Sequence, residues 1–167
     1  MIPLTPDGDS KSKWEDQAKE IVSLDREYLL ANLDDLLVWL MDINWPGSRR
    51  IADYLVGVGN PLIPHIKKVL ASDDSGWIYF VIDRIISNWS EELVFEIKQE
   101  LIDISKEFDY EGNFINALAI LKKKNQISEH FFSEQIKEAK LKIESKEFFN
   151  AESKNGLLDD LHSLKDI

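Results

Sequence analysis

The sequence predicts an all-α protein in which antiparallel helix pairs stack as a short, right-handed α-α arc of eight or nine helices. Apolar residues recur at the three- and four-residue spacing of buried helix faces, and no segment shows the two-residue alternation of a strand. Prolines and glycines stand where helices start and stop. Helix caps at Asp25, Asn60, Ser90 and Ser128 are 35, 30 and 38 residues apart, which is the order of a helical repeat but irregular. An irregular helical bundle is the alternative.

The expected helices follow from apolar stripes and their caps. They span 13–22, 26–41, 46–56, 61–71, 75–89, 91–108, 113–124, 128–149 and 157–164. The expected pairs are 26–41 with 46–56, 61–71 with 75–89, and 91–108 with 113–124. Pro46 and the cap Asn60 should open two of these helices, and Asn155-Gly156 should end the eighth.

The composition is that of one globular domain. A chain of 167 residues, 44% hydrophobic and 31% charged, is long enough for a buried core. Residues 1–11 are rich in Pro, Asp, Gly and Ser, so we expect a flexible arm there and a single helical domain over 12–167. The sequence shows no cysteine, no secretory signal and no long apolar segment, which predicts a cytoplasmic protein.

Charge is unevenly distributed along the chain. The net charge is −11, and residues 122–167 carry nine basic and nine acidic side chains, so the first 121 residues hold the whole excess. Between 71 and 111, three basic residues stand against eleven acidic ones, a local net charge of −8. Such a surface repels nucleic acid and anionic lipid and attracts basic partners. We therefore predict no nucleic-acid or membrane binding.

The expected helix 91–108 carries an acidic stripe beside its apolar one. The stripe consists of Glu92, Glu96, Glu100, Asp103 and Glu107. A solvated face is the default interpretation of such a stripe, and a partner-binding face is the alternative. Carboxylates along one exposed helix face diverge, whereas Mg²⁺ and Ca²⁺ need converging oxygens, so we predict no metal site.

Three further residues complete the predicted partner-binding set. Asp73 and Asp74 extend the acidic region, although their simplest role is to cap the helix that begins near Ser75. Trp45, in the turn before Pro46, either staples that turn or stands at the rim of a binding surface. The staple is the favoured interpretation.

The sequence contains no constellation of catalytic or cofactor-binding residues. His65, His130 and His162 lie far apart, and none has an acid or a second histidine at ligand spacing on its helix. No HExxH, P-loop, dinucleotide-binding or GxSxG motif is present. We therefore predict that the protein is not an enzyme and binds no cofactor.

Two motifs at a defined spacing resemble a family of small bacterial all-helical proteins of unknown function. They are D-x-N-W-P at 42–46 and P-L-x-P-x-I at 61–66. Further matching residues are Trp39-Leu40, Gly59, Val69-Leu70, Asp73-Asp74, Trp77-Ile78-Tyr79 and the turn at Trp89 and Glu91. The likeness covers about 30–108. It implies a HEAT-like helical fold and no known enzyme activity, and some relatives resemble immunity proteins, which neutralise a cognate toxin domain in contact-dependent growth inhibition.

Residues and resemblance together predict a non-enzymatic protein-binding module. The first hypothesis is a cytoplasmic immunity protein that neutralises a basic toxin domain, such as a nuclease, through its acidic surface. The alternative is a helical-repeat adaptor that binds an endogenous protein. The adaptor hypothesis predicts a groove with exposed apolar or aromatic residues rather than an acidic face.

Overall fold

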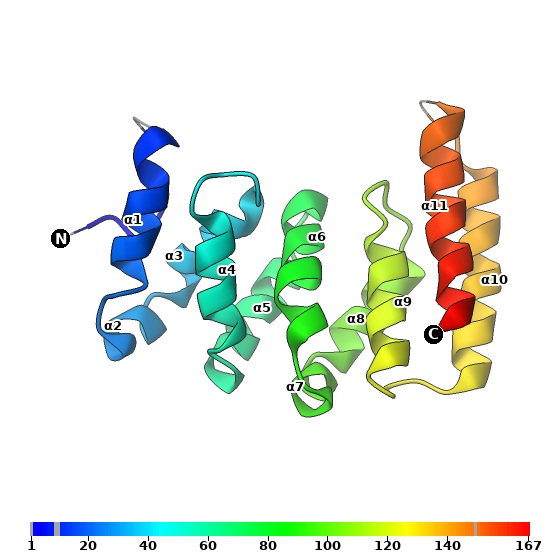
Figure 1. Cartoon of the computed structure of the whole chain (residues 1–167). Helices are drawn as coiled ribbons and strands as arrows, with labels where there is room; N and C mark the ends of the chain where they lie inside the picture. Colours follow the sequence, from blue (N-terminus) through cyan, green and yellow to red (C-terminus); the bar gives the residue numbers. More distant parts are fainter. Residues whose placement is uncertain (1, 9–10, 149) are drawn as a thin grey trace. The chain divides into compact units, whose positions relative to one another are not determined.

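Helices make up all of the regular secondary structure in the part of the chain that the structure describes (Figure 1). This structure is a computed structural model, and it describes residues 2–8, 11–148 and 150–167. Within those ranges it contains eleven α-helices, five short 3₁₀ helices and no strand. The all-α prediction is therefore confirmed, and so is the packing of helices as antiparallel pairs. The right-handed arc stays a prediction.

The chain divides into two compact units, Met1–Trp89 and Ser90–Ile167. We predicted one helical domain over 12–167. Each unit has its own helices and its own buried side chains, and each is described separately below.

The described residues of the first unit form six α-helices. They are α1 (Trp14–Ile21), α2 (Arg26–Leu30), α3 (Leu33–Leu37), α4 (Ser48–Val56), α5 (Ile63–Leu70) and α6 (Ser75–Arg84), and 3₁₀ helices span Lys11–Lys13, Val38–Met41, Asn60–Leu62 and Ile86–Asn88. The predicted helix 26–41 is divided into α2, α3 and the turn Val38–Met41. At the first division the Asn32 side chain donates a hydrogen bond to the Tyr28 carbonyl (2.7 Å) and so competes with the helical backbone.

Two predicted helix starts are corrected. Helix α4 begins at Ser48 rather than Pro46, because the chain first turns through Gly47 in a left-handed conformation (φ +88°). Asn60 does not cap a helix with its side chain. It lies in a 3₁₀ turn that follows Gly59 (φ +71°), and α5 begins at Ile63. Pro64 lacks the N–H that an α-helical bond to the Asn60 carbonyl would need.

Apolar faces of these helices form the core of the first unit. Its fully buried side chains include Leu29, Leu33, Leu36, Trp39, Leu40, Ile51, Leu55, Leu62 and Ile66. Helix α4 packs against α1, α3 and the turn Val38–Met41, and α5 packs against α6. These contacts confirm the predicted pairing of 26–41 with 46–56 and of 61–71 with 75–89.

An ionic contact joins α3 to α5 at the surface of this unit. One carboxylate oxygen of Asp34 lies 2.5 Å from Nδ1 of His65, and the other accepts a hydrogen bond from Nζ of Lys68 (2.7 Å). The hydrogen bond from Lys68, followed by the one from His65, holds the pKa of Asp34 below its ordinary value. The contact therefore favours the ionised carboxylate.

We expect Asp34→Asn to lower the free energy of unfolding by about 0.5 kcal/mol at neutral pH, because largely exposed ion pairs contribute little. Folding lowers the pKa of Asp34, so its carboxylate contributes fully to the free energy of unfolding above the pKa of the unfolded state. This contribution is lost as the pH falls through the pKa of the folded state. Urea denaturation should therefore show that Asp34→Asn has a lower free energy of unfolding than wild type at about pH 7 and the same free energy of unfolding at about pH 2. Asp35→Asn, an exposed neighbour, is the control. A difference that persists in acid would contradict the ionic account.

The first residues, which we expected as a flexible arm, contact α1 and its neighbours. Leu4 is buried, and its carbonyl accepts a hydrogen bond from Nε1 of Trp39 (2.6 Å). Gln17 on α1 donates to the carbonyls of Pro3 and Thr5, both at 2.8 Å. Residues 1, 9 and 10 of the predicted arm lie outside the described residues.

Five α-helices form in the part of the second unit that the structure describes. They are α7 (Glu91–Glu96), α8 (Lys98–Lys106), α9 (Asn113–Lys123), α10 (Glu129–Ser145) and α11 (Ala151–Ser163), and a 3₁₀ turn spans Leu164–Asp166. The predicted helix 91–108 is divided at Ile97, whose φ and ψ of −117° and 15° interrupt the helix. Helix α8 packs against α9, which confirms the third predicted pair.

The C-terminal helix pair differs from the prediction. Helix α10 ends at Ser145, and the predicted end at 149 lies outside the described residues. Helix α11 starts after Asn150, whose side chain accepts from the Ser153 N–H (2.8 Å). It continues through Asn155-Gly156, which we predicted as a break. A glycine inside a helix costs about 1 kcal/mol, and α11 offsets this by packing on α10 (Figure 1). The buried side chains at this contact are Phe132, Ala139, Ile143, Leu157, Leu161 and Leu164.

Candidate acidic binding surface

Helices α7 and α8 carry four of the five carboxylates that we predicted on one helix, and the fifth follows α8. Glu92 and Glu96 lie on α7, Glu100 and Asp103 lie on α8, and Glu107 follows the end of α8. The break at Ile97 means that these residues do not form one unbroken helical stripe. All are exposed except Glu100, which is partly buried and whose Oε2 atom is inaccessible to solvent. The exposed carboxylates form the candidate surface, which we call the α7–α8 acidic surface.

The first turn of α7 is held in place by its own cap and by the turn before α10. The Ser90 hydroxyl accepts a hydrogen bond from the Leu93 N–H (3.5 Å), as the sequence predicted. The Glu91 carboxylate accepts from Nδ2 of Asn125 (2.8 Å), and the Glu91 carbonyl accepts from Nε2 of Gln126 (3.2 Å). Asn125 reaches this position because it adopts a left-handed conformation (φ +56°), which asparagine tolerates. These bonds fix the helix that presents Glu92 and Glu96.

The charge of Glu92 is favoured by its position. A hydrogen bond from the Ser90 hydroxyl, followed by one from the backbone, lowers the pKa of the Glu92 carboxyl. A carboxylate in the first turn of a helix is also stabilised by the helix dipole. Glu92 therefore stays ionised at neutral pH. Asp103 accepts a hydrogen bond from Nε2 of Gln99 (3.0 Å), one helical turn away on α8.

An exposed aromatic residue lies on α7, which also carries Glu92 and Glu96. The Phe95 side chain is 62% exposed, although phenylalanine is usually buried. It lies three residues after Glu92, so these two side chains are neighbours on the surface of α7. We did not predict Phe95 as a binding residue. Its signal was present: Phe95 lies outside the apolar stripe formed by Leu93, Ile97 and Leu101.

The other predicted partner-binding residues lie in the first unit. Asp73 and Asp74 are exposed, and the Asp74 carboxylate accepts a hydrogen bond from the Trp77 N–H (2.9 Å). This confirms the helix-capping role of Asp74. Trp45 is half-buried, with its ring 5.4 Å from that of Trp14 in an edge-to-face arrangement. This packing agrees with the staple interpretation. Partner binding by Trp45, Asp73 and Asp74 stays a prediction.

The described residues do not bring metal-binding side chains together. No group of three or more His, Cys, Asp or Glu residues in residues 2–8, 11–148 and 150–167 could hold a metal ion. The same part of the chain contains no helix long and apolar enough to cross a lipid bilayer. The chemistry that the α7–α8 acidic surface offers is recognition of positive charge beside an aromatic ring.

Residues 9–117 match the family described as Domain of unknown function (DUF5071). The chain belongs to the DUF5071 family. The match includes the D-x-N-W-P and P-L-x-P-x-I motifs and extends beyond the 30–108 region in which we recognised a resemblance. The DUF5071 region also contains the whole α7–α8 acidic surface. No curated protein matches the sequence.

Proposed function

We propose that this DUF5071 protein is a non-enzymatic immunity protein with a HEAT-like helical fold. In this proposal it neutralises the basic domain of a bacterial toxin, such as a nuclease, in the cytoplasm of the cell that makes it. The observation that carries the proposal is the α7–α8 acidic surface, in which α7 carries the exposed side chains of Glu92, Phe95 and Glu96 and has its first turn held by hydrogen bonds. Charge of this kind steers a cationic partner into contact and speeds association. Aromatic residues, phenylalanine included, are enriched in the cores of protein interfaces.

A growth-rescue experiment tests this proposal. An immunity protein is encoded beside its toxin, so the proposal requires a toxin gene next to this one; cells would express the C-terminal domain of that toxin together with this protein. We expect wild-type protein to restore growth and Glu96→Lys/Asp103→Lys to fail, with association slowed about 10- to 100-fold. These two residues are exposed, whereas Glu100 is partly buried and is left unchanged.

The matched control is Asp159→Lys/Asp160→Lys on α11, where two exposed carboxylates are reversed in the charge-balanced part of the chain. This variant changes the net charge equally and should still restore growth. If both charge-reversal variants restore growth equally, the α7–α8 acidic surface does not bind the toxin. If the wild-type protein does not restore growth to cells that express the toxin from its own locus, the immunity function itself is contradicted.

An adaptor that binds an endogenous protein is the second candidate, and one pocket in the second unit favours it. This pocket has a volume of about 600 Å³ and is lined by Tyr110, Glu147, Phe148, Ser153 and Leu157. Tyr110 is 63% exposed, and its ring lies 5.7 Å from that of Phe148. An exposed aromatic wall of this kind is what the adaptor hypothesis predicted. A partner that stays bound after charge reversal on α7 and α8 would favour this function.

A further inference from the structure

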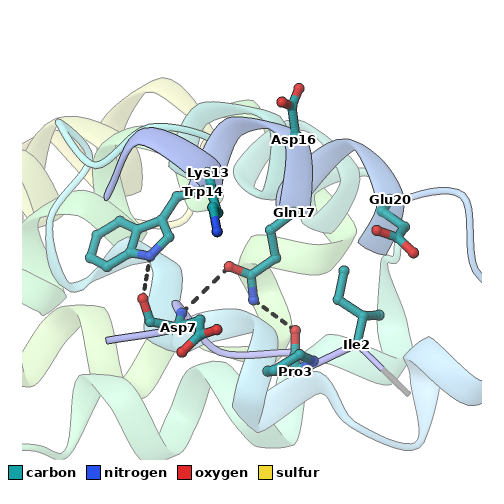
Figure 2. A pocket seen from close by; sticks show the side chains of 8 residues that line it. All are labelled: Ile2, Pro3, Asp7, Lys13, Trp14, Asp16, Gln17 and Glu20. Carbon is teal, nitrogen blue, oxygen red and sulfur yellow. Dashed lines mark hydrogen bonds between the residues drawn. The ribbon is translucent and has the colours of Figure 1, made fainter. Parts of the chain in front are cut away.

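The N-terminal residues of the first unit lie against three side chains that bind peptide backbone. Trp14 and Gln17 come from α1, and Trp39 comes from the turn Val38–Met41. The indole of Trp14 donates to the Asp7 carbonyl (2.5 Å), and the indole of Trp39 donates to the Leu4 carbonyl (2.6 Å). Gln17 binds on both sides, since its amide nitrogen donates to the carbonyls of Pro3 and Thr5 and its oxygen accepts from the Asp7 N–H (3.4 Å). Figure 2 shows Trp14 and Gln17 reaching towards Pro3 and Asp7.

These contacts recognise the backbone of the segment more than its side chains. The bound segment, Pro3-Leu4-Thr5-Pro6-Asp7, forms no helix or strand, and four of its carbonyls accept hydrogen bonds from Trp14, Gln17 and Trp39. Its one buried side chain is Leu4, which is 6% exposed. Two prolines separated by two residues favour an extended backbone that loses little entropy on binding. Grooves lined with aromatic residues bind such segments in proteins that recognise proline-rich peptides.

The segment and its binding surface are separable in the sequence. Trp14, Gln17 and Trp39 lie inside the DUF5071 match at 9–117, whereas residues 3–7 lie outside it. A pocket of about 410 Å³ lies beside the segment, and its lining includes Pro3 and Asp7 of the segment and Trp14 and Gln17 of α1 (Figure 2). The segment itself forms part of the wall of this pocket.

We propose that Trp14, Gln17 and Trp39 form a docking site for an extended Pro-Leu-x-Pro segment of a partner protein, which residues 3–7 of this chain occupy as an internal ligand. A partner segment binds by displacing residues 3–7 and takes over their hydrogen bonds to the two indoles and the Gln17 amide. The internal ligand competes at the high effective concentration of a tethered segment, about millimolar for a short flexible connection. Weak ligands therefore do not displace residues 3–7, whereas a partner segment of sufficient affinity does.

The test uses the full-length chain and the synthetic peptide acetyl-Ile-Pro-Leu-Thr-Pro-Asp-amide, followed by the NMR signals of the indole N–H groups of Trp14 and Trp39. Leu4→Asp introduces a charge at the buried position of the internal ligand and leaves all three docking side chains intact. In this variant we expect saturable shifts of both indole signals, with an affinity at least about tenfold higher than in wild type because the tethered competitor is weakened. A peptide with Asp in place of Leu should not bind.

Two further variants decide whether the peptide occupies this site. Adding Gln17→Ala to Leu4→Asp should reduce the peptide affinity about tenfold, whereas adding Lys19→Ala, an exposed residue on the same helix, should not change it. If Leu4→Asp unfolds the first unit, Pro3→Gly/Pro6→Gly weakens the internal ligand through backbone entropy instead, without adding a charge. Absence of peptide binding to the folded variants, or binding that is insensitive to Gln17→Ala, would overturn the proposal.

Discussion

Replacing Gly47 by alanine is expected to lower the free energy of unfolding of the first unit by about 2 to 4 kcal/mol. Gly47 has a φ of +88°, a conformation that strains any residue with a Cβ atom. A Cβ at this position would also lie 2.5 Å from Cβ of Ala18 and 2.8 Å from the Trp14 carbonyl oxygen. Both neighbours belong to α1, and the second is backbone, so the conflict is relieved only by moving α1 away from α4.

Urea denaturation followed by tryptophan fluorescence measures this effect selectively, because all five tryptophans lie in the first unit. Gly57→Ala, at the other end of α4, is the matched control. Gly57 has a right-handed φ of −78°, and its added Cβ would make an ordinary 3.5 Å contact. That variant should stay within about 0.5 kcal/mol of wild type or be slightly more stable. Equal stability of the two variants would contradict the close approach of α1 and α4 at Gly47.

Replacing Trp39 by alanine is expected to cost about 3 to 5 kcal/mol. The Trp39 side chain is fully buried, and its ring lies 6.3 Å from that of Trp14 in an edge-to-face arrangement. Its indole N–H also binds the carbonyl of buried Leu4. The substitution therefore removes core volume, an aromatic contact and the hydrogen-bond partner of a buried carbonyl at once.

A graded series separates these contributions, with unfolding followed by circular dichroism because the fluorophore changes. Trp39→Phe keeps a ring but lacks the N–H, so we expect a loss of about 1 to 3 kcal/mol, intermediate between wild type and Trp39→Ala. Trp45→Ala is the comparison at a half-buried tryptophan of the same cluster and should cost less than Trp39→Ala. If Trp45→Ala lowers the free energy of unfolding as much as Trp39→Ala does, the central role of Trp39 in this core is contradicted.

Local patterns in the sequence were sufficient to predict most helices and their buried faces. Leu29, Leu33, Leu36 and Leu40 follow helical spacing and are all buried. Asp25 caps its helix as expected, because an N-cap depends on residues only three positions apart. The DUF5071 match agrees with the resemblance read from the proline and tryptophan motifs.

Features that depend on long-range contacts were not predicted. The bond between Trp39 and Leu4 joins residues 35 positions apart, and the contact between His65 and Asp34 joins residues 31 apart. Nothing in the local composition of 1–11 indicates that Leu4 is buried, which is why we expected a flexible arm. Asn155-Gly156 has the composition of a helix break, but packing between α10 and α11 outweighs that local preference.

The candidate site was predicted in composition but not in geometry. Summed charge identified the acidic region, and the helical stripe placed its carboxylates on one face. The interruption at Ile97 divides that stripe between α7 and α8, and the backbone angles of a single apolar residue carry no sequence signature. Phe95 was missed because an aromatic residue in an amphipathic helix is expected to be buried.

Affinity capture from the source bacterium tests whether the α7–α8 acidic surface binds a basic toxin domain. Wild-type protein, Glu96→Lys/Asp103→Lys and Asp159→Lys/Asp160→Lys would serve as parallel baits, with elution by rising salt and identification by mass spectrometry. We predict that wild type and the α11 variant retain the same basic toxin fragment, that salt releases it, and that the α7–α8 variant loses it. Capture of a housekeeping complex that all three baits retain and salt does not release would contradict such binding.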